Sequence, residues 1–577
     1  MRHQPVFSQP RLKLIPNQWD ILAFLLVLCL IIMLVWTGSH MSLPFQLGEI
    51  IPISLDPWML PQYALQTVVR MFIALFFSFV FSLGVATLAA KNPRAGRLII
   101  PLIDILQSVP ILGYLSIAVV GFIALFPGSM LGPECAAIFA VFTSQVWNMT
   151  LSFYQSMKTI PLELTEATHV YQLSAWQRFW RLELPFGMPG LLWNAMMSMS
   201  GSWFFIVAAE AISIGNQNIT IPGIGSYIAL AITQESMAAI AYAIATMLVV
   251  IILYDQLFFR PLVAWSEKFH LSTINEGESR SWVLDLFQRT RLFQHVTDWL
   301  SDINDAFVNI RWLRKRKNHS HYLTLEQDYS TTHNILWYSL IAILAVTGIA
   351  LLWRFIYHNI PLGETWQVVV MGFYTALRVF ISIIVCSLIW VPIGVWVGLR
   401  PRVTQWVQPV AQILAAFPAN LFFPVIVLMI LRYHLNIEIW CSLLMALGTQ
   451  WYILFNVIAG ASAIPKELKL AAENMQLSGW LKWKRFLFPA IFPYYVTGAI
   501  TAAGGSWNAS VVAEVVQWGH TKLIANGLGA YITLNTNAGN FAAIALGIVV
   551  MCTWVTLVNF LVWRKLYQFA QERYRMG

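Results

Sequence analysis

The chain alternates between long apolar runs and short segments that carry most of the basic residues. The apolar runs have the length that a membrane-spanning helix needs, or come close to it. In the first half they cover about 21–36, 65–90, 101–126, 136–155, 191–213 and 238–259, and in the second half about 335–356, 368–397, 407–431, 439–458, 494–516 and 541–563. The pattern predicts an all-α polytopic membrane protein with about 12 transmembrane helices, six in each half.

Charge between the runs predicts how the chain lies in the membrane. The segment before the first run is basic, and no small-residue cleavage site follows that run, so we expect an uncleaved anchor rather than a signal peptide. Basic residues then alternate with Glu134, which is expected outside. The positive-inside rule places both termini and the basic segments in the cytoplasm. The basic positions are Arg2, Arg11, Lys13, Lys91, Arg94, Arg97, Arg260, Arg400, Arg402, Arg564 and Lys565.

One segment between the fourth and fifth runs occurs twice. Residues 160–185 read IPLELTEATHVYQLSAWQRFWRLELP, and residues 464–489, 304 positions later, read IPKELKLAAENMQLSGWLKWKRFLFP. The same offset relates Trp203 to Trp507 and Glu210 to Glu514. The chain therefore contains an internal duplication. Because each half has an even number of spans, the halves are expected to be parallel repeats related by an axis along the membrane normal.

The apolar pattern stops between the two halves. We therefore divide the chain into a first domain at 1–262, a charged cytoplasmic linker at 263–333 and a second domain at 334–577. Residues 282–300 have helical apolar spacing, so part of the linker is expected to lie on a membrane or on a partner. His319 and His321 are interpreted as solvated linker residues rather than a metal site. The sequence leaves the role of the linker open.

Composition agrees with an integral membrane protein. The chain is 58% hydrophobic and only 11% charged, with a mean hydropathy of +0.66. The formal charge of +9 could suggest a nucleic-acid partner, but the basic residues stand between apolar runs. The five cysteines occur singly and are expected to pack in the interior. They are Cys29, Cys135, Cys386, Cys441 and Cys552.

Chemical motifs argue against an enzyme. The sequence has no G-x-x-x-x-G-K-[ST] phosphate loop, no nucleophile motif and no cluster with metal-ligand spacing. We therefore expect no catalytic residue, no metal and no cofactor bound by this chain.

The duplicated segment carries a family resemblance. In the first copy Glu166-Ala167-Thr168, Gln172 and Leu184-Pro185 have the spacing of the EAA, Gly and Leu-Pro positions in the cytoplasmic coupling loop of ABC-importer permeases. The second copy keeps the spacing with Leu470-Ala471-Ala472, Gln476 and Phe488-Pro489. We name residues 160–185 and 464–489 the first and second coupling loops. An amphipathic segment that lies on the membrane surface is the alternative.

This resemblance implies a type I ABC importer permease fold, with two permease domains fused in one chain. It also implies two cytoplasmic ABC ATPase subunits that bind ATP and Mg²⁺, a periplasmic substrate-binding protein, and a place in the bacterial inner membrane. Because Leu470 stands where the first loop has Glu166, the first loop is expected to couple more strongly. The residues expected to couple to the ATPase are Glu163, Glu166, Ala167, Gln172, Pro185, Glu467, Ala471, Ala472, Gln476 and Pro489.

A narrower resemblance concerns the solute. Thr67 and Arg70 match Thr375 and Arg378, and the segment 101–110 matches 409–418, all at an offset of 308. With the repeated Trp–Glu segments, they resemble the permease branch that imports nitrate, taurine, alkanesulfonates or bicarbonate. The resemblance implies import of a small anion by alternating access and does not identify the anion. An ion-coupled carrier with parallel halves and a non-transporting membrane scaffold or sensor are the alternatives.

Charges inside apolar runs are the candidate pathway residues, since a charge near the bilayer centre costs at least about 2.5 kcal/mol. Arg70 and Arg378 are predicted either to snorkel to the interface or to form a positive collar that attracts an oxoanion. Glu210 and Glu514 are either structural carboxylates or part of the substrate path. Trp203 and Trp507 are more often packing residues than ligand contacts. The repeated Gly223-x-Gly225 and Gly527-x-Gly529 are interpreted as periplasmic turns.

Overall fold

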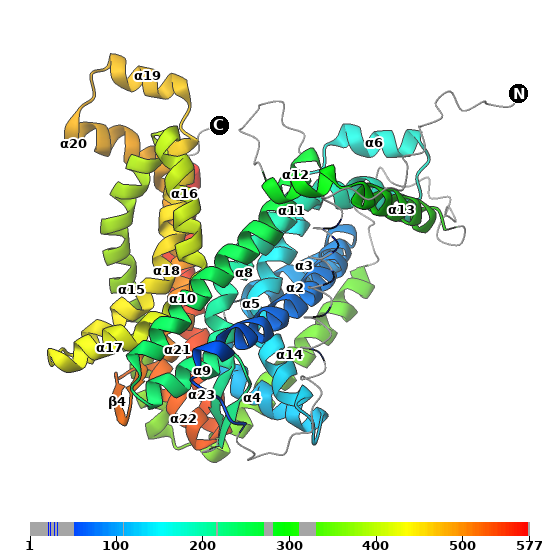
Figure 1. Ribbon diagram of the computed structural model, residues 1–577. Coiled ribbons are helices and arrows are strands. Elements are labelled where there is room, and N and C mark those ends of the chain that lie inside the picture. Colours follow the sequence, from blue (N-terminus) through cyan, green and yellow to red (C-terminus); the bar gives the residue numbers. More distant parts are fainter. Residues whose placement is uncertain are drawn as a thin grey trace, which may run out of the picture. The chain divides into compact units, whose positions relative to one another are not determined.

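The computed structural model describes residues 51–107, 109–214, 217–269, 281–310 and 331–574, together with five single positions between 21 and 38. Most of the predicted anchor, with Cys29, lies outside the described residues, as do His319 and His321. The described part of the chain is almost entirely helical and contains two short β-hairpins (Figure 1). The predicted all-α class is confirmed.

The chain divides into two compact units, which are described separately below. Unit 1 is made of Met1–His40, Ser152–Asn194 and Leu253–Tyr322, so it groups the first coupling loop with the linker. Unit 2 is made of Met41–Leu151, Ala195–Ile252 and Leu323–Gly577. These units do not follow the domain boundaries predicted at residues 262 and 334.

Unit 1 contains short helices. They are α6 (Leu162–Val170), α7 (Ala175–Arg178), the π-helical η2 (Phe179–Glu183) and η3 (Asp255–Phe259), α11 (Arg260–Ser266), η4 (Glu267–Phe269), α12 (Trp282–Arg289) and α13 (Arg291–Val308). Helices α12 and α13 cover the stretch at 282–300 that has helical apolar spacing. Helices α5 (Leu131–Lys158), α8 (Leu184–Ala209) and α10 (Met237–Tyr254) belong partly to each unit.

Unit 2 contains most of the long helices. From the first half it has η1 (Pro57–Met59), α2 (Leu60–Lys91), α3 (Pro93–Leu106), α4 (Ile111–Leu125), β1 (Ala211–Ile214), β2 (Gln217–Thr220) and α9 (Ile224–Thr233). From the second half it has α14 (Thr331–Asn359), α15 (Leu362–Gly398), α16 (Pro401–Ala416), η5 (Ala419–Phe422), α17 (Phe423–Arg432), α18 (Ile437–Ser462), α19 (Lys466–Asn474), α20 (Gly479–Lys482), η6 (Trp483–Leu487), α21 (Phe488–Ala513), β3 (Val515–Trp518), β4 (Thr521–Ile524), α22 (Leu528–Ala538), α23 (Phe541–Val558), η7 (Asn559–Trp563) and α24 (Arg564–Tyr574).

The hairpins repeat with the sequence. Strands β1 and β2 pair antiparallel with Ala211 opposite Thr220, and β3 and β4 pair with Val515 opposite Ile524. Both partners shift by the same 304 positions as the coupling loops, so the duplication extends to strand register. The hairpins were not predicted, because strands of four residues carry too short a pattern to separate from a loop.

Among the described residues, eight continuous helical runs and two bent helix pairs have the length and hydropathy of membrane spans. They correspond to ten of the twelve predicted runs. The run predicted at 136–155 lies in α5, which has 28 residues but is less apolar, with Gln145 and Asn148 in its middle. The first run lies mostly outside the described residues.

The third span of each half is broken, although the apolar pattern predicted one straight helix. Helices α3 and α4 meet at 101°, and the helical segments on either side of Phe417 and Pro418 meet at 77°. Proline removes a backbone donor and pushes the preceding residue into an extended conformation. Phe417 accordingly has φ −72° and ψ 127°, and α4 begins directly after Pro110.

Close helix packing positions the site within unit 2. Helices α18 and α21 pack so tightly that a Cβ at Gly498 would lie 2.9 Å from the carbonyl oxygen of Tyr452. Small residues allow such approach between apolar helices. This packing brings the middle of α21 beside the aromatic face of α18.

Candidate functional site

A buried ion-pair cluster joins three elements of the first half in unit 2. Arg70 on α2 donates from Nε and Nη2 to both carboxylate oxygens of Glu134, at 2.5 and 2.7 Å, and from Nη1 to Glu210 Oε1 at 2.7 Å. Glu134 lies in the first turn of α5, and Glu210 directly follows α8. Thr67 donates to Glu210 Oε1 at 2.7 Å. Arg70 is 1% exposed and Glu210 0%.

The second half repeats this cluster with equivalent residues. Arg378 on α15 donates from Nη1 to Glu514 Oε1 at 2.9 Å and from Nη2 to Glu438 Oε2. Thr375 donates to Glu514 Oε1 at 2.8 Å. Glu438 is more accessible than its counterpart Glu134, with 36% of its side chain exposed against 4%. The two clusters therefore share their residue types and differ in detail, because Arg378 Nε donates to the backbone carbonyl of Glu438 rather than to its carboxylate, and Glu438 is more exposed than Glu134.

The repeated glycines explain why a carboxylate fits beside a helix start. A Cβ at Gly223 would lie 2.3 Å from the Glu210 carboxyl carbon, and a Cβ at Gly527 would lie 2.2 Å from Glu514 Oε2. Gly225 N donates to Glu210 Oε2 at 2.7 Å. The backbone donors at the starts of α9 and α22 thus meet a negative charge, which the positive end of a helix favours. These glycines are helix starts rather than free turns.

This geometry differs from the predicted positive collar. Arg378, like Arg70, is nearly inaccessible at 5% exposure, and both guanidinium groups donate to carboxylates and to backbone carbonyls. A fully paired guanidinium does not present free donors to a solute. Glu210 and Glu514 are both 0% exposed, and Trp203 and Trp507 are 0% and 3% exposed.

Glu134 and Glu438 are the cluster members that the sequence reasoning missed. Glu134 was interpreted only as an outside charge. The signal was available, because the two glutamates are 304 positions apart, like Glu210 and Glu514.

A cavity in unit 2, which we name the central cavity, lies between α8, α18, α21 and the break after α16. Its volume is about 80 Å³, and it is lined by aromatic rings and a few hydroxyl groups. The lining residues include Phe204, Phe417, Trp451, Tyr452, Phe455, Ser200 and Thr449, with Gly201 and Gly505 leaving room on α8 and α21. All lining residues are described and none is charged. Both halves contribute, so the cavity is a candidate solute position.

A larger cavity of about 860 Å³ lies near the clusters, where Gly225 and Ser226 line it. We name it the vestibule. Among its lining residues, all of them described, Lys522 on β4 is the single charged one. Asn420 lines the vestibule and donates from Nδ2 to the carbonyl oxygen of Phe204 at 3.2 Å. Because Phe204 lines the central cavity, this hydrogen bond joins residues of the two cavities. The positive charge thus enters the vestibule from a hairpin that the sequence reasoning did not consider.

Each coupling loop is two short helices joined at a glutamine. Gln172 has φ 53° and Gln476 has φ 50°, the left-handed conformation that usually selects glycine. Leu173 N donates to Thr168 O and Leu477 N to Ala472 O, both at 3.0 Å, which closes each helix end. The bend therefore persists although the family's glycine is absent. Of the residues predicted to couple, Glu163, Glu166, Glu467, Ala471 and Gln476 are among those whose side chains are exposed.

A π-helical segment lies at the end of each coupling loop. Segments η2 and η6 occupy matched positions, as do η3 and η7 near the ends of the two halves. In unit 1, Arg178 pairs with Glu183 at 2.8 Å and Arg260 with Asp255 at 3.0 Å. Both pairs are five residues apart, the hydrogen-bond spacing of a π-helix. Such segments are frequent at functional sites.

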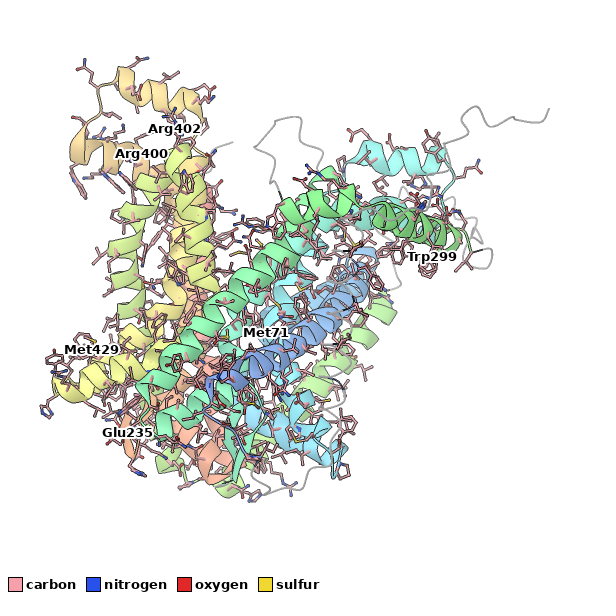
Figure 2. All side chains as sticks on the ribbon, viewed as in Figure 1. Met71, Glu235, Trp299, Arg400, Arg402 and Met429 are labelled. Atoms are coloured by element: carbon pink, nitrogen blue, oxygen red, sulfur yellow. The ribbon has the colours of Figure 1, made fainter. Side chains whose placement is uncertain are left out.

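Basic residues gather at the coupling-loop end of unit 2. Arg400 and Arg402 lie at the end that carries α19 and α20, whereas Glu235 lies at the other end (Figure 2). Because α21 connects the second coupling loop to Glu514, one stiff helix joins that basic end to the second ion-pair cluster.

Comparison with known protein families identifies the family to which both halves of the chain belong. Residues 78–259 and 390–575, together more than half of the chain, match the model of the binding-protein-dependent transport system inner membrane component. The chain belongs to this family. The two matches fall one in each half, so the predicted fusion of two permease domains in one chain is confirmed.

Individual relatives indicate which permeases of this family the chain is similar to. The chain is 27% identical over 200 residues to the nitrate import permease protein NrtB of Leptolyngbya laminosa, a match that covers 35% of this chain and 67% of the relative. It is 26% identical over 192 residues to the bicarbonate transport system permease protein CmpB of Synechococcus elongatus, covering 33% and 63%. A glycine betaine/proline betaine transport system permease, ProW of Escherichia coli, is 27% identical over 164 residues, covering 28% and 44%. The first two names support the predicted nitrate and bicarbonate branch, and the chain spans about two thirds of those relatives.

Proposed function

We propose that this chain is the membrane pore of an ATP-driven ABC importer that moves a small anion from the periplasm to the cytoplasm by alternating access. Two separate ATPase subunits bind ATP and Mg²⁺ and dock on the two coupling loops, and a periplasmic binding protein delivers the solute. Both termini then lie in the cytoplasm, and the chain lies in a bacterial inner membrane. Glu163, Glu166, Ala167, Gln172 and Pro185, with their counterparts in the second loop, form the contacts to the ATPases.

The observation that carries this proposal is the coupling loop that recurs in both halves of a chain from this permease family. Each loop ends in a π-helical segment, which leads into a long helix that ends at a buried ion-pair cluster. The 26 residues of α21 extend over about 39 Å, enough to cross a membrane. A displacement at the loop therefore moves the helix that lines the central cavity.

The size and lining of the two cavities support a small anion. A single water needs about 10–15 Å³, so the central cavity of about 80 Å³ has room for a solute of a few heavy atoms. Tyr452 supplies a hydroxyl group without a fixed charge, whereas the hydroxyls of Ser200 and Thr449 already donate to backbone carbonyls, and this lining favours passage over tight binding. Lys522 supplies positive potential in the vestibule, and nitrate and bicarbonate permeases are among the relatives.

Reconstitution tests the proposal. Vesicles that contain the purified chain, its ATPase subunits and its binding protein should accumulate labelled nitrate or bicarbonate only when ATP and Mg²⁺ are present on the ATPase side. Uptake driven by a proton or sodium gradient without any ATPase would favour the ion-coupled carrier. A lack of transport under both conditions, by protein that is folded and bound to its ATPases, would favour the scaffold.

A further inference from the structure

Linker helix α13 is attached to the first coupling loop in unit 1. Trp176 Nε1 donates to the carbonyl oxygen of Phe307 at 3.2 Å, and Gln177 Nε2 donates to Asn309 Oδ1 at 3.0 Å. The Phe307 ring packs edge-on against the rings of Trp176 and Trp180, with centroids 5.0 and 5.3 Å apart. Hydrogen bonds, aromatic packing and a backbone contact converge on one end of α13, so the helix is a built part of this loop's surface.

The matched surface of the second coupling loop is different. Trp480, the counterpart of Trp176, is 79% exposed, and Leu481, which replaces Gln177, is 50% exposed. Lys484 stands in place of Trp180. The second loop thus lacks two of the three side chains that hold α13 on the first loop, and its tryptophan is open.

The two surfaces have opposite charge. The first coupling loop has three glutamates and two arginines, a net charge of −1, and α13 adds three aspartates and one arginine, which gives −3 in total. The second loop has five basic and two acidic residues, a net charge of +3. The aspartates Asp298, Asp302 and Asp305 are exposed, so the acidic charge of α13 faces outward. With α13 attached the first surface is acidic, and the second surface is basic.

We infer that α13 is part of the docking surface for the first ATPase subunit, and that this chain binds two different ATPase polypeptides. One of them has a basic docking groove that fits the first loop with α13, and the other has an acidic groove that fits the second loop. Two copies of one ATPase present identical grooves, and one groove cannot complement surfaces of −3 and +3, because like charges across an interface oppose binding and select against a partner. This inference rests on the proposed function.

Cross-linking of the full chain in its native membranes tests the inference. A photoreactive amino acid replaces Tyr171 in one variant and Met475 in another, since these matched positions are 78% and 74% exposed. Mass spectrometry then identifies the protein joined to each position. We expect two different ATPase polypeptides, one at each position. The same polypeptide at both positions would overturn the inference and leave the proposed function standing, and no ATPase at either position would overturn the proposed function itself.

A charge comparison on the same photoreactive proteins provides the matched control. Asp298→Asn, Asp302→Asn and Asp305→Asn together should lower the yield of the adduct at residue 171 about three- to tenfold, and leave the adduct at residue 475 unchanged. Lys466→Gln, Lys469→Gln and Lys484→Gln together should do the reverse. If the aspartate variant leaves the adduct at residue 171 unchanged, α13 takes no part in docking, and the inference is overturned.

Discussion

At the scale of single residues, each half depends on an arginine that joins three elements. The planar guanidinium of Arg70 reaches two carboxylates and the carbonyl oxygen of Pro222, a geometry that the single ammonium of lysine does not reproduce. The duplication made Arg70 and Glu210 predictable as a repeated pair. It did not indicate their burial, because the apolar pattern places a residue in a helix without saying what packs around it.

The first prediction compares the two arginines. Arg70→Gln leaves two buried carboxylates without their cation, and breaking a buried pair by removing one partner costs about 3–5 kcal/mol. Arg378→Gln should cost less, because Glu438 has 36% of its side chain exposed and retains water. Thermal unfolding of the purified protein should show a larger loss for Arg70→Gln, with Arg432→Gln as a surface control. Equal losses would contradict the hydration difference.

The glutamines at the loop bends give a second prediction at this scale. A non-glycine residue in the left-handed region costs about 1–2 kcal/mol, so Gln172→Gly and Gln476→Gly should relieve strain where the backbone already has φ 53° and 50°. Gln172→Val should instead destabilise the bend, because a β-branched residue fits that region worst. Hydrogen exchange of the amides of Gln172 and Leu173 measures the effect. Slower exchange in Gln172→Val than in Gln172→Gly would show that the bend is not strained.

At the scale of elements, sequence reasoning located the coupling loops and missed how they continue. The repeat and its resemblance to a permease coupling loop identified both loops, and helices α6 and α19 begin directly after Pro161 and Pro465. The π-helical segments at the ends of the loops were not predicted, since amino-acid composition does not distinguish an α- from a π-helix. In the first half, the charged pair at Arg178 and Glu183 was the available signal.

The third prediction concerns the inequality of the two loops. Glu166 and Leu470 occupy the same exposed position on α6 and α19, and removing a hydrogen bond to a charged group at an interface costs about 1.5–3 kcal/mol. Glu166→Ala should therefore reduce stimulation of ATP hydrolysis by the binding protein more than tenfold. Leu470→Glu should preserve or raise it, and Leu468→Glu on the same helix is the control for added charge. A silent Glu166→Ala together with a harmful Leu470→Glu would reverse the proposed order of the loops.

At the scale of the whole molecule, apolar run length predicted ten of the spans, and the duplication predicted the two halves. Neither pattern could predict that the linker groups with the first coupling loop. This grouping depends on the packing of residues far apart in sequence, such as Trp176 against Phe307. The apolar pattern also did not indicate the ion pairs of Arg70 and Arg378, the residues of the predicted collar. Its donors are used inside the clusters, and the positive charge that lines a cavity belongs to Lys522.

The last prediction follows from the position of Lys522 in the vestibule. Lys522 is exposed in a vestibule of about 860 Å³, so it acts through water rather than as a binding contact. A unit charge at about 8 Å in water contributes about 0.5 kcal/mol, and Lys522→Gln should therefore raise the apparent KM for nitrate or bicarbonate about two- to threefold. The maximal rate should stay unchanged, because the charge attracts the anion without holding it.

The difference in KM between Lys522→Gln and the unmodified protein should disappear at high salt, where the screening length falls to about 3 Å at 1 M. Uptake by reconstituted vesicles at two ionic strengths measures both effects, and Arg432→Gln, an exposed cation outside the vestibule, is the matched control. If both variants raise the KM equally, net charge rather than the vestibule attracts the solute; uptake of a cation or an uncharged sugar by the unmodified protein would remove the anion assignment.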